Sequence, residues 1–239
     1  FFRFEYIRES IFHDDAYKAI ICFPEFLAIY DEHGELHDEF EDDMMQAFKW
    51  VIENVQEFYQ VSREDIDRYF AEYRRRCEHL GYSLRVYYMK LCRFLMRSDG
   101  EELPRVYEQF HRARRDRISD CEACEANFDM EIALHLGDTE KALKIAAPIL
   151  QGEKRCAEVP HKTYSTLAEH FLYRGDLDEA QYYAALCERW TQLKPEFLYD
   201  TGTLLEVASV MDPQHGWTML KHTLSDYMAS RNPESRLNY

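Results

Sequence analysis

The chain has 239 residues, of which 45 are Asp or Glu and 29 are Lys or Arg, so its formal net charge is −16. This charge argues against a protein that binds a nucleic-acid backbone, because such binding depends on clustered Lys and Arg side chains. The sequence contains no run of about 20 apolar residues, so we expect no membrane-spanning helix and no membrane partner.

The cysteine content favours the cytoplasm. Seven cysteines are present, an odd number, whereas secreted disulfide frameworks usually have an even number in a shorter chain. Reduced thiols are typical of the cytoplasm. We therefore predict a cytoplasmic protein, and its acidic composition fits a partner that is itself basic.

Helices are predicted along the whole chain, because no segment shows the sustained alternation expected for a strand. Residues 1–39 are interpreted as an N-terminal helical extension. An acidic stretch at residues 31–43 holds eight carboxylates and no Lys or Arg. Residues 40–239 are predicted to form a helical-repeat domain that continues directly from the extension.

The clearest amphipathic pattern begins shortly after the acidic stretch. Apolar residues recur there at spacings of three and four, which predicts one apolar stripe on a helix. These residues are Met44, Phe48, Val51, Ile52, Val55 and Phe58. Ser62 and Ser119 are each followed three residues later by an acidic residue, as in a capping box, and so predict helix starts.

A six-residue phrase occurs twice, 38 residues apart, as GDTEKA at residues 137–142 and as GDLDEA at residues 175–180. In each copy the glycine closes one helix, the aspartate caps the next, and the alanine lets the two helices pack closely. This is the pattern of the tetratricopeptide repeat, whose period is about 34 residues. The phrase predicts an all-α fold, a right-handed α-α superhelix of tetratricopeptide-like hairpins, with the additional residues in the loop at 152–160.

The sequence also resembles a group of bacterial tetratricopeptide-repeat proteins from actinobacteria and firmicutes. The segments that carry the resemblance are AFKWVI at 47–52, SDCEAC at 119–124 and CAEVPHKTY at 156–164. The likeness extends from about residue 40 to the C-terminus. It implies an α-helical solenoid, and it implies no particular activity.

Four residues have the composition of a structural zinc site. Cys121 and Cys124 are spaced as CxxC, and Cys156 and His161 follow after 31 intervening residues. Three thiolates and one imidazole complete a tetrahedral shell. In a solenoid the starts of successive first helices are neighbours, so a zinc ion there would hold the longer loop between the repeats.

The alternative interpretation is structural. A single CxxC is common, so Cys121 and Cys124 can be ordinary helix residues while Cys156 and His161 make local loop contacts. A redox dithiol at Cys121 and Cys124 is disfavoured, because no βαβ context surrounds the pair.

Function is predicted from the repeat architecture. The sequence has no Gly-rich phosphate loop, nucleophile elbow or zincin motif, so we predict no enzyme. By analogy with other helical-repeat arrays, we predict a scaffold that binds a protein or peptide partner, such as a toxin-neutralising immunity protein or a regulator. The alternative is a receptor for a peptide signal or a small ligand. A zinc-dependent hydrolase is the least favoured hypothesis, because a closed shell of three cysteines and a histidine leaves no position for water.

Overall fold

The structure is a computed structural model, and it describes residues 2–13, 15–34, 37–98 and 100–239. These residues form α-helices and short 3-10 helices, and no strand occurs among them. Consecutive helices pack against one another, which confirms the predicted all-α class and is consistent with a helical-repeat superhelix. None of the described helices is both long enough and apolar enough to span a membrane.

The chain divides into two compact units, Phe1–Ser119 and Asp120–Tyr239, which we call the N-terminal and the C-terminal unit. The described helices of the N-terminal unit are α1 (Phe2–Phe12), α2 (Ala16–Glu32), α3 (His37–Asn54), η2 (Val55–Glu57), α4 (Arg63–Leu80), α5 (Arg85–Met96) and α6 (Leu103–Arg112). Helices α1 and α2 pack on each other and on α3, so the predicted N-terminal extension is helical. A domain boundary after residue 39 stays a prediction.

The apolar stripe predicted from residue 44 to residue 58 forms the centre of the N-terminal unit. All six of its residues are buried, with exposed fractions of 4% or less. The ring of Phe48 lies 4.8 Å from that of Phe23 on α2 and 5.3 Å from that of Tyr73 on α4, measured between ring centroids. Three helices therefore share one aromatic core.

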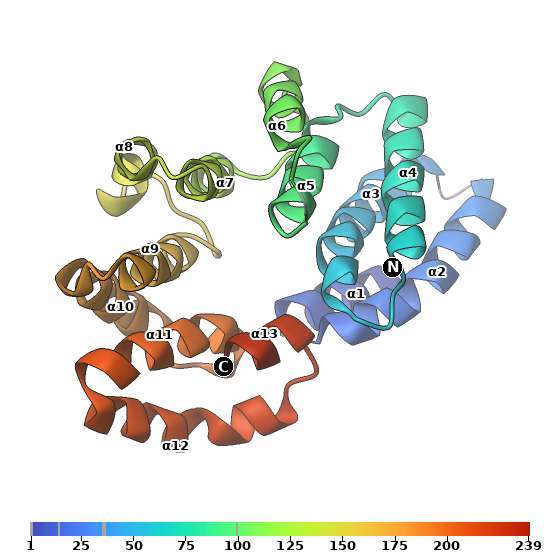
Figure 1. Ribbon diagram of the computed structural model, residues 1–239. Helices are drawn as coiled ribbons and strands as arrows, with labels where there is room; N and C mark the ends of the chain where they lie inside the picture. Colours follow the sequence, from blue (N-terminus) through green and yellow to red (C-terminus); the bar gives the residue numbers. More distant parts are fainter. Residues whose placement is uncertain (1, 14, 35–36, 99) are drawn as a thin grey trace. The chain divides into compact units, whose positions relative to one another are not determined.

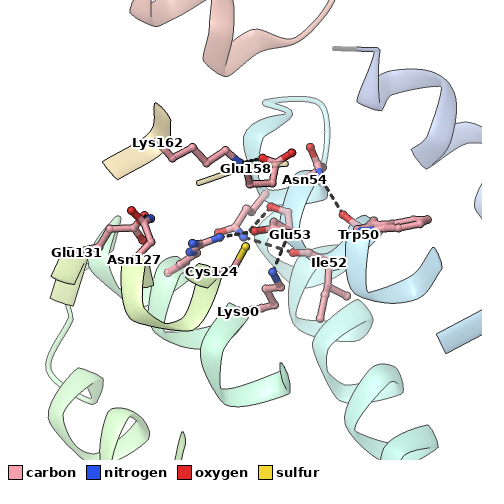
Figure 2. Close-up of polar contacts among 12 residues, drawn as sticks. Trp50, Ile52, Glu53, Asn54, Lys90, Cys124, Asn127, Glu131, Glu158 and Lys162 are labelled. Carbon is pink, nitrogen blue, oxygen red and sulfur yellow. Dashed lines mark hydrogen bonds and ion pairs between the residues drawn. The ribbon is translucent and has the colours of Figure 1, made fainter. Parts of the chain in front are cut away.

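A buried ion pair joins α3 to α5 in the same unit. The ammonium group of Lys90 donates a hydrogen bond of 2.8 Å to Oε2 of Glu53, and Figure 2 shows the two side chains pointing toward each other. Arg93 forms a second ion pair with the same carboxylate. The Lys90 side chain is only 2% exposed, so this charge lies inside the protein.

The C-terminal unit consists of helical hairpins, coloured from yellow-green to red in Figure 1. Its described helices are α7 (Glu122–His135), α8 (Thr139–Leu150), α9 (His161–Arg174), α10 (Leu177–Thr191), η3 (Pro195–Phe197), α11 (Leu198–Met211), α12 (Pro213–Ala229) and α13 (Pro233–Asn238). Helix pairs α7–α8, α9–α10 and α11–α12 form the hairpins, and the first helices α7, α9 and α11 also pack in succession.

The twice-repeated phrase forms the predicted helix ends, but only the first of its two aspartates caps a helix with its side chain. Gly137 and Gly175 both have left-handed φ values, +81° and +80°, and each follows the helix that it closes. Asp138 caps α8 by accepting a hydrogen bond of 3.0 Å from the backbone N–H of Lys141. Asp176 makes no side-chain capping hydrogen bond and pairs with Arg174 instead. Ala142 and Ala180 are fully buried, so each allows close contact within its hairpin.

The short helix α13 packs against α11 at a glycine. A Cβ atom at Gly202 would lie 2.8 Å from the backbone nitrogen of Tyr239 and closer still to the carbonyl group of Asn238. Hydrogen bonds from the Asn238 amide to the Tyr199 carbonyl (2.7 Å) and to the Thr203 hydroxyl (3.2 Å) complete this contact. The backbone of the C-terminal segment thus lies directly on α11.

Candidate metal site

The start of α7 places two cysteines on one turn of helix. The predicted cap, Ser119, does not cap this helix, because its hydroxyl accepts a hydrogen bond of 2.9 Å from the backbone N–H of Asp116. Cys121 is the N-cap instead, and its sulfur accepts a hydrogen bond of 3.5 Å from the backbone N–H of Cys124. Residues three apart share a helix face, so the two sulfurs point to the same side.

The third cysteine comes from the loop between α8 and α9. Gly152, with φ +78°, turns the chain after α8, and the backbone N–H of Cys156 donates a hydrogen bond of 2.9 Å to the carbonyl of Val159. Val159 packs with Ile149 and Ala123 in a small core that holds this loop against α7.

Sequence-distant cysteines thereby meet in one cluster. The sulfurs of Cys124 and Cys156 are 3.5 Å apart, and the sulfurs of Cys121, Cys124 and Cys156 all lie within 4.8 Å of one another. Cys121 is exposed, and the other two are half-buried. The cluster of Cys121, Cys124 and Cys156, which we call the cysteine cluster, could hold a metal ion, and thiolates are the ligands that soft metals prefer.

A buried hydrogen bond supports this geometry by joining α7 to α9. The hydroxyl of Thr163 donates to the Asn127 side-chain carbonyl at 2.6 Å. The Asn127 amide in turn donates to Glu131, and Figure 2 shows these two side chains next to each other. Thr163 is fully buried and Asn127 is 1% exposed. The starts of α7 and α9 therefore lie side by side, as expected for successive first helices of a solenoid.

The surroundings favour the thiolate form of Cys121 and disfavour that of Cys124 and Cys156. Burial opposes ionisation of Cys121, but hydrogen bonds at the helix start, above all from the Cys124 backbone, leave its pKa below the ordinary value. Burial raises the pKa of Cys124, and repulsion by Cys156 raises it further. Burial also raises the pKa of Cys156. A metal ion must therefore displace protons, so its affinity should increase with pH.

The fourth predicted ligand, His161, does not lie in the cysteine cluster. Its ring is 1% exposed and stacks on Trp190 of α10, with 4.6 Å between ring centroids. Phe197 of η3 packs edge-on at the same centroid distance. As the first residue of α9, His161 faces α10 and α11, and its Nε2 atom lies 3.8 Å from a carboxylate oxygen of Asp200 on α11.

Asp200 was not identified from the sequence as a candidate site residue, although a charged residue within a mostly apolar helix could have indicated it. It is 4% exposed and stands in α11, where Glu206 is the only other charged residue. Burial raises the pKa of Asp200 to about 6. Burial lowers the pKa of His161 to about 4, and Lys162 adds to this effect.

The His161–Asp200 pair predicts opposing pH effects on stability. Between about pH 4 and pH 6, native Asp200 keeps a proton that the unfolded chain loses, so its contribution to stability falls as pH rises. Native His161 is neutral above about pH 4, whereas the unfolded residue stays protonated up to about pH 6.5, so its contribution to stability rises over nearly the same interval. The two contributions largely cancel in the wild-type protein.

Substitution of either member should expose the contribution of the other. In Asp200→Asn we expect the free energy of unfolding, relative to wild type, to rise by up to about 3 kcal/mol from pH 4 to pH 6.5. In His161→Phe, which keeps an aromatic ring, we expect the free energy of unfolding relative to wild type to fall by a similar amount over the same pH interval. Urea denaturation of the three proteins at several pH values measures these slopes. Parallel profiles for all three would contradict the assignment.

Comparisons of the chain with protein-family models, with curated proteins and with solved structures find no match. The resemblance to bacterial tetratricopeptide-repeat proteins accordingly stays a prediction. The fold itself defines the class, an all-α chain of packed helical hairpins. The particular site in it is a cluster of three cysteines that could hold a metal ion.

Proposed function

We propose that this chain is a non-catalytic helical-repeat scaffold that binds a basic protein or peptide. The observation that carries the proposal is a surface shared by α9 and α11, formed by Glu169, Tyr173 and Glu206. The Tyr173 ring is 71% exposed, and its hydroxyl donates to both carboxylate oxygens of Glu206 at 3.2 Å. We call this surface the α9–α11 face.

The charges on the α9–α11 face favour a cationic partner. Burial raises the pKa of Glu169, and electrostatic repulsion by the Glu206 carboxylate raises it further. A Lys or Arg side chain of a partner would relieve this repulsion. The exposed ring of Tyr173 on the same face offers a rigid contact area and an aromatic surface for cation–π interaction with the partner. The net charge of −16 would speed the encounter with a basic partner.

A toxin-neutralising immunity protein or a regulator is the biological role that fits such a scaffold, because either works by covering a basic surface. The proposal places the protein in the cytoplasm and assigns it neither a nucleic-acid nor a membrane partner. The alternative role, a receptor for a small ligand or a peptide signal, would use an enclosed site. The depression at the end of α10, lined by Ala185, Glu188, Arg189, Gln192 and Leu193, is largely open to solvent.

The cysteine cluster serves this scaffold as a zinc site. A zinc ion bound by the three thiolates would connect the loop at 151–160 to the start of α7, and thus one hairpin to the next.

The three-cysteine geometry also bears on the hydrolase alternative, since catalytic zinc uses three protein ligands and one open position. Catalysis further requires a positioned general base. Glu122, one of the acidic residues beside the cysteines in the sequence, has a side chain that is 72% exposed and pairs with Lys154, and we keep binding as our proposal.

Selection from a displayed peptide library tests the proposed partner class. We expect the selected peptides to be enriched in Lys and Arg, and we expect Glu169→Gln/Glu206→Gln to weaken their binding by at least about tenfold, or 1.4 kcal/mol. The matched control is Glu102→Gln/Glu140→Gln, which removes the same charge from side chains that are 62% and 82% exposed. Selected peptides without basic residues, or equal weakening by both double variants, would rule out the α9–α11 face.

A further inference from the structure

The cysteine cluster supplies three ligands to a metal ion, one fewer than a closed tetrahedral shell needs. Among the residues that the structure describes, the group of His, Cys, Asp and Glu side chains at this place consists of Cys121, Cys124 and Cys156 alone. The expected fourth ligand, His161, is enclosed between Trp190, Phe197 and Asp200. Bringing its imidazole to the sulfurs would break this stack and expose a buried ring.

The accessible side of the cysteine cluster is the side of Cys121. Cys121 is exposed and stands outside the first turn of α7, whereas Cys124 and Cys156 are half-buried against the small core of Ala123, Ile149 and Val159. A metal ion held by the three sulfurs would therefore contact protein on the side of the loop. Its remaining side would face solvent near Cys121.

We propose that the cysteine cluster binds a zinc ion whose fourth coordination position is open to solvent and accepts a neutral nitrogen donor, such as the imidazole of a histidine on a partner. This inference rests on the zinc site of the proposed function and extends it. Binding of Zn²⁺ to the three thiols releases up to three protons, and the donor then replaces one water molecule without further proton loss.

The charge of the site favours a neutral donor over a fourth thiolate. One Zn²⁺ and three thiolates carry a net charge of −1, and the whole chain carries −16. A fourth thiolate would add another negative charge, whereas imidazole adds none and is a common zinc ligand. A histidine on a basic partner could thus bind the metal while the partner's Lys and Arg side chains contact the acidic surface of this chain.

Metal substitution tests the open position in the full chain. The protein is loaded with Co²⁺ under a phosphine reductant, which supplies no thiol, and its visible absorption is followed while imidazole is added. We expect a saturable shift of the cobalt bands in the wild-type protein and in His161→Phe, with the same spectrum for both proteins before imidazole. A spectrum that imidazole leaves unchanged would overturn the open position. An altered His161→Phe spectrum that imidazole restores would assign the fourth position to His161 and overturn it as well.

Zinc content separates failure of this inference from failure of the zinc site itself. We expect about one equivalent of zinc in the wild-type protein and in Cys22→Ser, whose half-buried cysteine lies in the N-terminal unit. In Cys156→Ser we expect the zinc affinity to fall by at least about tenfold. If the wild-type protein binds no zinc, the zinc site and the inference both fail. If it binds zinc through the three cysteines but imidazole does not change the cobalt spectrum, only the inference fails.

Discussion

Substitution of Glu53 by glutamine is expected to lower the free energy of unfolding by about 3 kcal/mol. Glu53 supplies the carboxylate for the ammonium group of Lys90 at 2.8 Å and for the guanidinium group of Arg93. The Lys90 side chain is 2% exposed, so its charge keeps little hydration after the substitution. Removing one partner from a buried ion pair costs more than the pair contributes, because the remaining charge stays buried. Urea denaturation followed by far-UV circular dichroism measures the loss.

An exposed ion pair in the same unit provides the control. Arg63 and Asp67 lie on one face of α4, 2.9 Å apart, with side chains that are 63% and 57% exposed. Asp67→Asn also converts an acid to its amide, but we expect a change below about 0.5 kcal/mol because water screens the pair. If Glu53→Gln costs no more than Asp67→Asn, the ion pair between α3 and α5 does not stabilise the unit.

Substitution of Phe48 by alanine is expected to cost about 3–5 kcal/mol, the range for truncating a fully buried aromatic side chain. Its ring contacts those of Phe23 and Tyr73, so the cavity would open where α2, α3 and α4 meet. The matched control is Tyr59→Ala, which truncates an aromatic side chain that is 88% exposed and should change stability by less than about 0.5 kcal/mol. A loss below about 1 kcal/mol for Phe48→Ala would mean that neighbouring side chains refill the space.

Helices and several of their ends could be predicted from the sequence because the signals are local, although Ser119 was wrongly predicted to cap α7. The spacing of apolar residues from Met44 to Phe58 identified a buried stripe, and all of these residues are in the core. The glycines at 137 and 175 marked helix ends that have the expected left-handed geometry. Such signals depend on neighbours three or four positions away, where the helix itself fixes the geometry.

The candidate site could be predicted only in part. The position of its fourth predicted ligand, His161, depends on which neighbouring helix the side chain faces, and this is set by tertiary packing. The pairing of CxxC with Cys156 followed from the neighbouring starts of first helices, and the three sulfurs do meet. His161 stands where the chain enters α9, and its spacing from Cys156 does not determine whether the ring faces α7 or α10. The stack with Trp190 decides this, through an aromatic contact 29 residues further along the chain. The Glu53–Lys90 pair, 37 residues apart, had no local signal either.

Gly202 imposes a limit on how this sequence can vary over evolution. Even the single methyl group of alanine would overlap the carbonyl of Asn238 and crowd the nitrogen of Tyr239, and both obstacles are backbone atoms that no change of rotamer can move. Related chains that keep α13 against α11 should therefore keep glycine at this position, whatever side chains surround it. Chains that have lost the glycine should also have released or rebuilt the segment after residue 230. The presence or absence of glycine at this position would then indicate, for each related chain, whether α13 packs on α11.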